Sequence, residues 1–202
     1  MSTNILFYVH YNKFNRLSDH VVFQLEAMRQ IYDEIYLISN SQLSDGDLNS
    51  LASKGLYDSF LQRKNSGYDF CAWSDGIKAY GYDQLDKFDN LTLMNDTCFG
   101  PFWDFKPTFD KFTNKTNVDF WGITNNRSHT VKPENSSSVT LPDHIQSYFV
   151  TFKRQVVISQ SFHDFFANIK VLDDVVQVII QYETAMTKFF EDRGFKSDVL
   201  FD

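Results

Sequence analysis

The sequence predicts an α/β protein, in which a largely parallel sheet is covered by helices on both of its faces. Short apolar runs alternate with amphipathic segments along the first half of the chain, and this strand–helix alternation is typical of such sheets. Hydrophobic residues make up 43% of the 202 residues, which is ample for a packed core and excludes wholesale disorder. The length favours one domain over residues 1–202, and no linker that would divide it is evident.

Four strands and three helices are expected in the first half of the chain. The apolar runs at residues 5–9 and 35–38 are typical of buried strands. Between them, apolar residues at spacings of three and four over 21–31 predict a helix, with Ser18 or Asp19 as its N-cap. The later elements are a short helix at 47–53, a weak strand at 58–61, a helix at 70–80 with Asp69 near its start, and a strand at 91–94.

The second half is expected to hold a loop, two strands and two helices. Residues 125–140 are rich in Asn, Ser and charge and lack periodicity, so we expect a mobile surface loop there. The last helix, 174–193, carries an apolar stripe and is followed by Gly194, where a C-terminal cap is typical. The remaining elements are strands at 118–123 and 145–152 and a helix at 156–169.

Charge and composition limit the classes of partner. The formal net charge is −7 and no long run of Lys or Arg occurs, which argues against a nucleic-acid polymer as partner. No apolar stretch is long enough for a transmembrane helix, and the N-terminus lacks the pattern of a signal peptide, so we expect a cytoplasmic protein. Cys71 and Cys98 either pair or, as expected in a reducing cytosol, stay as two buried free thiols.

Polar clusters follow four of the expected strands. In open α/β sheets, ligands bind at the carboxyl ends of the strands, so these clusters are expected to face one cleft. Such a cleft would combine carboxylates, amides and cations, which suits a polar ligand. The four clusters are His10–Asn12, Ser39–Ser41, Arg63–Asp69 and Asn95–Thr97.

Two of these clusters carry the chemistry that a nucleotide needs. Asp96, at the end of a buried strand, is placed to hold a divalent cation that bridges a diphosphate. The alternative is a turn in which Asn95 and Asp96 bond their own backbone. Arg63 and the backbone amides before a helix suit a phosphate or a nucleobase, whereas the alternative is a solvated loop with Asp69 as N-cap.

Further residues are candidates for proton transfer, metal binding or stacking. His144 is either a metal ligand or proton carrier, or a structural residue at a strand start. Glu183 is either a general base that faces the cleft or a solvated helical side chain, and His10 is either a ligand contact or a hydrogen-bonded strand end. Aromatic residues make up 17% of the chain; those at 99–103 and Trp121 either wall a sugar or base site or pack in the core.

Taken in order, several short segments resemble the rhamnan synthesis F family of bacterial polysaccharide glycosyltransferases. Each piece is weak alone, but their order over nearly the whole chain is specific. The segments are His10–Asn12, Ser39–Ser41, Arg63–Trp73 (RxNxGYDFxxW), Asn95–Pro101 (NDTxxGP), Asp119–Thr124, His144–Phe149, and Tyr182-Glu183 through Gly194-Phe195.

The resemblance implies a GT-A-type fold, a Rossmann-like nucleotide-binding mixed sheet flanked by helices. It implies transfer of L-rhamnose, or a related sugar, from a dTDP-activated donor to a growing cell-wall or surface polysaccharide. The acceptor would be lipid-linked, and the protein would work at the inner membrane face by peripheral association. Lys106, Lys111 and Lys115 form a cluster that could face anionic lipid there.

The resemblance also implies where a metal and the donor bind. Asn95-Asp96-Thr97 occupies the place where GT-A enzymes hold Mn²⁺ or Mg²⁺. It has one carboxylate where many such enzymes have two, so His144 or Thr97 would complete the metal site. The residues expected to bind the nucleotide sugar are His10, Asn40, Arg63, Asn65, Gly67, Asp69, Asn95 and Trp121.

A catalytic base is implied as well. Glu183 precedes Gly194 at a spacing similar to that of the base in many inverting GT-A enzymes, and Asp143 and Asp119 are its rivals. Family members are often longer, so the chain is expected to be a truncated version or an isolated catalytic domain. The alternative is a catalytically inactive carbohydrate-binding or scaffolding subunit, which the single carboxylate of Asp96 favours.

Overall fold

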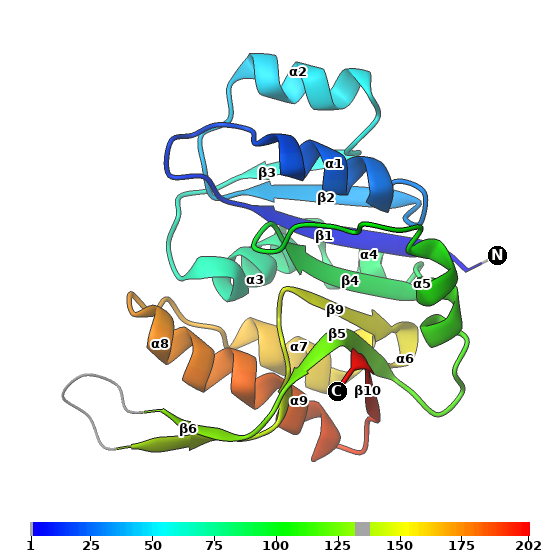
Figure 1. The fold of residues 1–202 in the computed structure, drawn as a ribbon, viewed down its shortest axis with the longest axis vertical. Coiled ribbons are helices and arrows are strands. Elements are labelled where there is room, and N and C mark those ends of the chain that lie inside the picture. Colours follow the sequence, from blue (N-terminus) through cyan, green and yellow to red (C-terminus); the bar gives the residue numbers. More distant parts are fainter. Residues whose placement is uncertain (1, 132–137) are drawn as a thin grey trace.

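An eight-stranded mixed sheet forms the centre of the protein in the computed structural model, which describes residues 2–131 and 138–202 (Figure 1). Its strands are β1 (Asn4–His10), β2 (Glu34–Ser39), β3 (Ser59–Gln62), β4 (Asn90–Asn95), β5 (Phe120–Asn126), β8 (His144–Ile145), β9 (Phe149–Lys153) and β10 (Ser197–Phe201). The order is β10-β5-β9-β4-β1-β2-β3, with β8 paired to β5. β1 to β4 run parallel, as do β5 and β10, whereas β9 is antiparallel to β4 and β5.

Helices cover both faces of this sheet, as the sequence predicts. One face is covered by α1 (Asp19–Met28), α2 (Asp45–Ser53) and α5 (Lys106–Thr113). The other is covered by α3 (Tyr68–Tyr80), α4 (Tyr82–Leu85), α6 (Arg154–Val157), α7 (Gln160–Ala167) and a C-terminal helix made of α8 (Val175–Val178), a π-helical segment (Ile179–Glu183) and α9 (Thr184–Glu191).

The alternation of side chains along β1 divides the core in two. All residues of this strand are buried, because helices lie over both faces. Ile5, Phe7 and Val9 belong to the cluster beneath α3 and α7. Leu6 and Tyr8 belong to the cluster beneath α1 and α5. An unbroken apolar run therefore marks a central strand, and this part of the sequence prediction is confirmed.

The segment 125–140 differs from the expected loop. β5 continues to Asn126, and β6 (His129–Val131) pairs antiparallel with β7 (Val139–Leu141); the part of the prediction that falls on residues 132–137 lies outside the described residues. The described residues of this segment are mostly exposed, and the hydroxyls of Thr130 and Thr140 lie 3.2 Å apart across the β6–β7 pair. Likewise, the strand expected at 145–152 is divided into β8 and β9.

Other boundaries were refined and some elements were missed. The helix expected at 156–169 is two helices, because Ser159 caps a new helix by accepting a hydrogen bond from the Phe162 amide. Gly194 follows the last helix with φ +89°, which confirms the predicted C-terminal cap. α4, α5 and β10 were not predicted.

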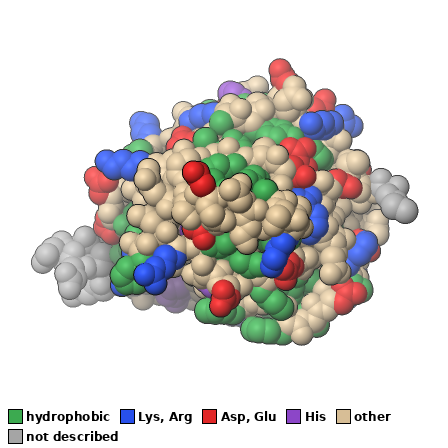
Figure 2. Space-filling model, turned by 90° about the horizontal axis from the view of Figure 1, so that it is seen from above, with side chains coloured by type: hydrophobic (Ala, Val, Ile, Leu, Met, Phe, Trp, Pro, Cys, Tyr) green, Lys and Arg blue, Asp and Glu red, His purple; other side chains and the backbone are tan. Residues whose placement is uncertain are grey.

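Surface and thiol predictions have mixed outcomes. Cys71 and Cys98 are both free, but only Cys71 is buried, so the expectation of two buried thiols is wrong for Cys98. In the lysine cluster, Lys106 pairs with Asp110 at 2.7 Å and Lys115 pairs with Asp198 at 2.6 Å. These carboxylates weaken the attraction of the cluster to anionic lipid. Acidic and basic side chains are interspersed on the face shown in Figure 2. Within the described residues, no helix is both long and apolar enough to cross a membrane.

Candidate functional site

The candidate site lies where the strand order reverses around β1. β2 and β3 lie on one side of β1 and β4 lies on the other, so the carboxyl ends of these strands meet at one edge of the sheet. The register aligns His10 with Ser39, Ser39 with Gln62, and Val9 with Asn95. The four polar clusters predicted to face one cleft therefore follow neighbouring strands.

Short hydrogen bonds join the clusters after β1, β2 and β4. His10 is fully buried and its Nδ1 lies 3.0 Å from Ser39 Oγ. The Asn40 amide donates to the His10 carbonyl at 2.8 Å, and the Tyr11 amide donates to Asp96 Oδ2 at 3.0 Å. Burial lowers the pKa of His10 and raises the pKa of Asp96. The strand ends thus hold a neutral imidazole near a carboxylate that is costly to ionise.

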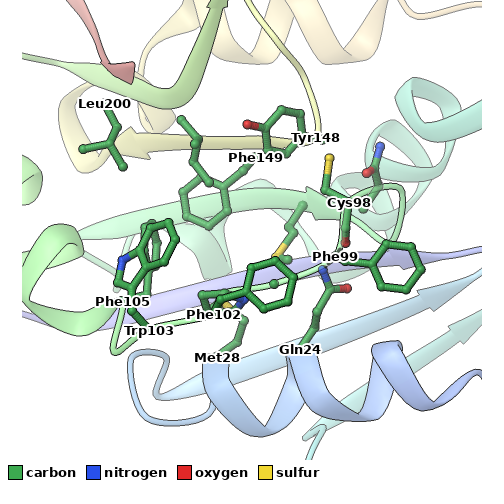
Figure 3. Close-up of a pocket in the computed structure, with 15 residues that line it drawn as sticks. Gln24, Met28, Cys98, Phe99, Phe102, Trp103, Phe105, Tyr148, Phe149 and Leu200 are labelled. Atoms are coloured by element: carbon green, nitrogen blue, oxygen red, sulfur yellow. Dashed lines mark hydrogen bonds between the residues drawn. The ribbon is translucent and has the colours of Figure 1, made fainter.

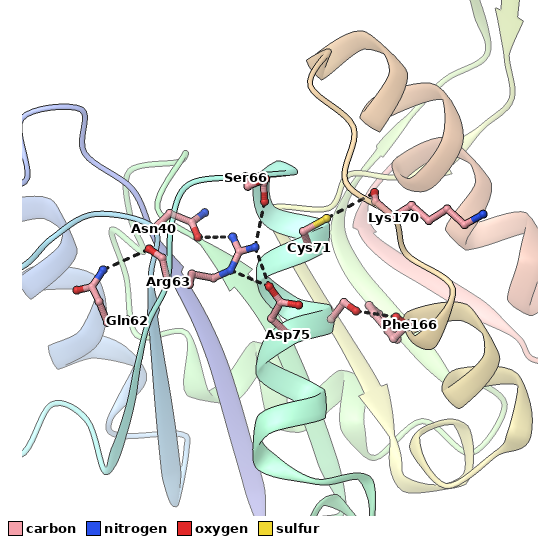
Figure 4. Close-up of polar contacts among 9 residues, drawn as sticks. Asn40, Gln62, Arg63, Ser66, Cys71, Asp75, Phe166 and Lys170 are labelled. Atoms are coloured by element: carbon pink, nitrogen blue, oxygen red, sulfur yellow. Dashed lines mark hydrogen bonds and ion pairs between the residues drawn. The ribbon is translucent and has the colours of Figure 1, made fainter.

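Arg63 braces the loop between β3 and α3 (Figure 4). Its Nη1 donates to Asn40 Oδ1 at 2.7 Å, and its Nη2 donates to the Ser66 carbonyl at 3.0 Å. Nε and Nη2 both donate to Asp75 Oδ2, at 3.0 and 2.8 Å. These bonds use four of the five guanidinium donors. The structure thus shows that Arg63 braces this loop, while its direct contact with a nucleotide sugar stays a prediction.

The loop ends at Gly67, which positions Asp69. Gly67 has φ +70°, and a Cβ there would collide with Cys71 Sγ, so the close start of α3 requires glycine. Asp69 Oδ2 accepts a hydrogen bond from Asn95 Nδ2 at 2.7 Å. Burial raises the pKa of Asp69 to about 6 despite this bond, and the charges of Asp96 and Glu183 act in the same direction.

Three predicted site residues converge on one cavity of about 230 Å³. Asp69, Asn95 and Glu183 line it, and they come from α3, β4 and the π-helical segment. Ser147 and Tyr148, from the turn between β8 and β9, complete the polar wall. A cavity with carboxylates of unequal environment is the arrangement expected for proton transfer and for recognition of a polar ligand.

Two residues of the β8–β9 region contact the carboxylate of Glu183. Ser147 donates from Oγ to Glu183 Oε2 at 2.7 Å, and His144 Nε2 lies 3.6 Å from Oε1. The His144 side chain has no exposed surface, and its Nδ1 lies 2.8 Å from the Pro142 carbonyl. Burial acts to lower the pKa of His144, but Glu183 and the carbonyl outweigh it and the pKa is raised. Sequence reasoning missed Ser147, although it lies in the matched segment His144–Phe149.

The predicted metal site is incomplete. Within the described residues, no group of three or more His, Cys, Asp and Glu side chains is arranged to hold a metal ion. His144 is turned toward Glu183, so its role as a metal ligand beside Asp96 is not supported. Asp96 is the one predicted ligand that still suits a cation, because it is a half-buried carboxylate at the end of β4 whose pKa is raised by burial, against the opposing effects of the Tyr11 amide, His10 and His20.

The predicted residues that lie outside this cavity include Trp121, Asp143 and Asn65. Trp121 is 0% exposed and stacks on Phe112 at a centroid distance of 4.8 Å, so its role as a donor contact is corrected to core packing. Asp143 is exposed, accepts a hydrogen bond from the Ser128 amide at 2.5 Å and lines a different hollow, which removes it as a rival to Glu183 in this cavity. Asn65 is exposed beside a neighbouring hollow formed with Gly67.

The fold resembles nucleotide-sugar enzymes of known structure. A nucleotide-diphospho-sugar transferase assigned as putative, from Desulfovibrio desulfuricans G20, matches with a TM-score of 0.54 and 17% identity over 100% of this chain and 81% of that chain. Mannosyltransferase PcManGT from Pyrobaculum calidifontis, solved with GDP-Man and Mn²⁺, matches with a TM-score of 0.57 and 8% identity over 98% of this chain and 55% of that chain. At such identities the likeness concerns the fold, and the expected GT-A-type fold is confirmed.

Sequence relatives are longer than this chain. The uncharacterized protein y4gN of Sinorhizobium fredii is 28% identical over 179 residues, which are 89% of this chain and 44% of that protein. The virulence protein VirA of Vibrio anguillarum is 27% identical over 146 residues, 71% of this chain and 42% of that protein. The chain therefore spans less than half the length of these relatives. The family model described as rhamnan synthesis protein F matches residues 35–202. The chain belongs to the rhamnan synthesis protein F family.

Proposed function

We propose that this chain is the catalytic part of a glycosyltransferase that uses a nucleotide-activated sugar. The observation that carries the proposal is the convergence of Asp69, Asn95 and Glu183 on one cavity at the strand ends of a GT-A-type sheet. The family description supports L-rhamnose, or a related sugar, as the transferred group, and dTDP is the carrier that we propose for it. A lipid-linked polysaccharide at the cytoplasmic membrane face is the proposed acceptor.

The proposed reaction is a direct displacement that inverts the anomeric carbon. Glu183 accepts the proton of the acceptor hydroxyl while that oxygen attacks the anomeric carbon, and the bond to the nucleoside diphosphate breaks. Ser147 and His144 hold the two oxygens of Glu183 and so fix the direction in which it accepts the proton.

The leaving diphosphate needs positive charge. Asp96 is the residue that would hold Mn²⁺ or Mg²⁺, which neutralises a departing diphosphate when bound. The Mn²⁺ in the structure of mannosyltransferase PcManGT supports the use of a divalent metal, and the choice of Asp96 as its ligand is our proposal. The proposed contacts with the nucleotide sugar are Asp69 and Asn95, which line the cavity, while Arg63 and Gly67 shape the loop before α3 that positions Asp69. His10 is fully buried, so its predicted role as a ligand contact is corrected to a support of the strand ends.

Glu183→Gln tests the base directly. Glutamine keeps the size of the side chain but cannot accept the proton, so transfer from dTDP-rhamnose should fall by at least about a hundredfold. Binding of dTDP with Mn²⁺, measured by calorimetry and by the rise in unfolding midpoint, should be unchanged because the nucleotide contacts remain.

Asp143→Asn is the matched control, because Asp143 lies outside the cavity and should keep full transfer. Retained turnover in Glu183→Gln would disprove the assigned base. If no nucleoside diphosphate binds, with or without metal, the donor site is wrong. If the donor binds but is neither transferred nor slowly hydrolysed, the result would instead indicate a carbohydrate-binding or scaffolding subunit.

A further inference from the structure

A second cavity of about 260 Å³ adjoins the candidate active site (Figure 3). Asn95 and Tyr148 line both cavities, so a ligand in the second one lies directly beside the first. The wall is formed by side chains from α1, from the loop after β4, and from β9, and Figure 3 shows them facing a common space. The residues that define its character are Met28, Phe99, Phe102, Trp103, Phe105 and Phe149.

The polar side chains of this wall already have partners within the protein. Gln24 accepts from the Tyr8 hydroxyl and donates to the Cys98 carbonyl, both at 2.5 Å. The Tyr148 hydroxyl lies 2.9 Å from Thr124 Oγ1. A saccharide placed here would lose hydrogen bonds with water that these groups cannot replace. The lining therefore selects an apolar ligand.

The mouth of the cavity is more exposed than is usual for aromatic side chains. Phe99, Phe102 and Trp103 are 70%, 77% and 55% exposed, although most large apolar residues of this chain are buried. A cluster of this kind marks a binding surface on a water-soluble domain. The cavity is slightly smaller than the range of about 300–1,000 Å³ found for drug-sized ligands. It would hold the start of a long chain, whose remainder would lie over the three aromatic rings.

We propose that this apolar cavity binds the aliphatic chain of the acceptor, with the saccharide end of the same molecule directed toward Glu183. The adjacency of the two cavities at Asn95 and Tyr148 sets this direction. The identification of the ligand as the acceptor rests on the proposed transferase function. The binding of an aliphatic chain in this cavity does not rest on it. The acceptor class is then an amphiphile with a short saccharide on an aliphatic chain.

Trp103 provides the readout. Trp73 and Trp121 are 1% and 0% exposed, so a change in tryptophan emission near the cavity reports Trp103, which is 55% exposed. Titration with monomeric decyl β-glucoside, below its micelle concentration, should give a saturable blue shift, and glucose alone should give none. The titration needs neither donor nor metal.

Paired variants test the location. Ile123→Phe fills the cavity from β5 and should weaken decyl glucoside binding at least tenfold, whereas Ile158→Phe, at a position 56% exposed and outside the cavity, should leave binding unchanged. If Ile123→Phe fails to fold, Phe102→Ser at the exposed mouth provides the same test, with Phe14→Ser, at a position 67% exposed outside the lining, as its control.

Several outcomes would overturn the proposal. They are a response that does not saturate, an equal response in Phe102→Ser and the unsubstituted chain, a response to phosphatidylcholine vesicles but not to decyl glucoside, and self-association that covers Trp103. If the protein binds decyl glucoside but does not bind dTDP, the result counts against the transferase function alone. If the protein binds dTDP but does not bind decyl glucoside, the result counts against the proposed role of this cavity alone.

Discussion

Asp69 is the residue in which the demands of folding and of function conflict most clearly. Burial at the start of α3 disfavours the charged form of its carboxyl, and the Asn95 amide and the charge of Arg63 offset this cost only in part. Asp96 and Glu183 add negative charge nearby. The ionised Asp69 therefore lowers the stability of the native state. A bound cation, or hydrogen-bond donors on a polar ligand, would offset this cost.

Asp69→Asn should therefore stabilise the protein in a pH-dependent way. Because the native pKa of about 6 is above the ordinary value, the native state holds its proton more tightly than the unfolded state. The contribution of Asp69 to the free energy of unfolding is full below about pH 4 and is lost as the pH rises through about 6. Asparagine can accept the same Asn95 bond without charge. Urea unfolding should show a gain of roughly 1–3 kcal/mol at pH 7.5 that vanishes near pH 4.

Asp83→Asn is the matched control for this experiment, since Asp83 is exposed and should show no such pH dependence. An equal gain for Asp69→Asn at both pH values would mean that the effect is not one of charge. A loss of stability at pH 7.5 would mean that the ionised carboxylate is favourable in the native state, contrary to the burial of Asp69.

At the scale of elements, the loop between β3 and α3 depends on one side chain. Arg63 ties β2 through Asn40, the loop through Ser66, and α3 through Asp75, and only 10% of its side chain is exposed. No other residue type offers a planar fork that reaches three partners. The brace keeps the start of α3, and with it Asp69, against the end of β4.

Arg63→Lys should loosen this loop although the charge is kept. A lysine ammonium cannot reproduce the forked contacts, so the free energy of unfolding should fall by about 1–2 kcal/mol. Amide hydrogen exchange should speed up in the loop and the first turn of α3, measured on the intact chain. The control is Arg154→Lys, whose pair with Asp86 is about half exposed and should cost less than about 0.5 kcal/mol. Equal losses in both variants would contradict the bracing role.

Elements whose signal is local were predicted well, and elements that depend on distant partners were not. The apolar run of β1 and the polar residues after it fix both a central strand and its place at the site. β10 has only half-buried side chains apart from its exposed last residue, and it exists as a strand because β5 lies beside it. Pattern also cannot give side-chain direction: the sequence leaves Trp121 compatible with a sugar site and with the core, and the side chain faces the core.

The same limit explains the site. Strand ends predicted that His10, Asn40 and Asn95 would be neighbours, because parallel strands share one edge. The contact of His144 with Glu183 joins β8 to a π-helical turn in a helix that the pattern presents as regular. Such turns often occur at functional sites, but apolar periodicity does not reveal them.

For the whole molecule, the sheet couples two cores that share no side chains. Trp73 lies in the cluster beneath α3 and α7, and Trp121 lies in the cluster beneath α1 and α5. Because each central strand contributes alternate residues to both clusters, loss of one cluster removes the support of the other. We therefore expect the described chain to unfold as one cooperative unit, in agreement with the single domain that the sequence predicts.

Two single-tryptophan proteins test this expectation. Trp103→Phe with Trp73→Phe leaves Trp121 as reporter, and Trp103→Phe with Trp121→Phe leaves Trp73. Within the described residues neither buried indole N–H has a hydrogen-bond acceptor, so phenylalanine removes an unsatisfied donor and limits the cost of each substitution. In each protein, the fluorescence transition in urea should coincide with the loss of far-ultraviolet circular dichroism. A fluorescence midpoint that differs from the dichroism midpoint of the same protein would show that the two faces unfold separately, and that the sheet does not couple them.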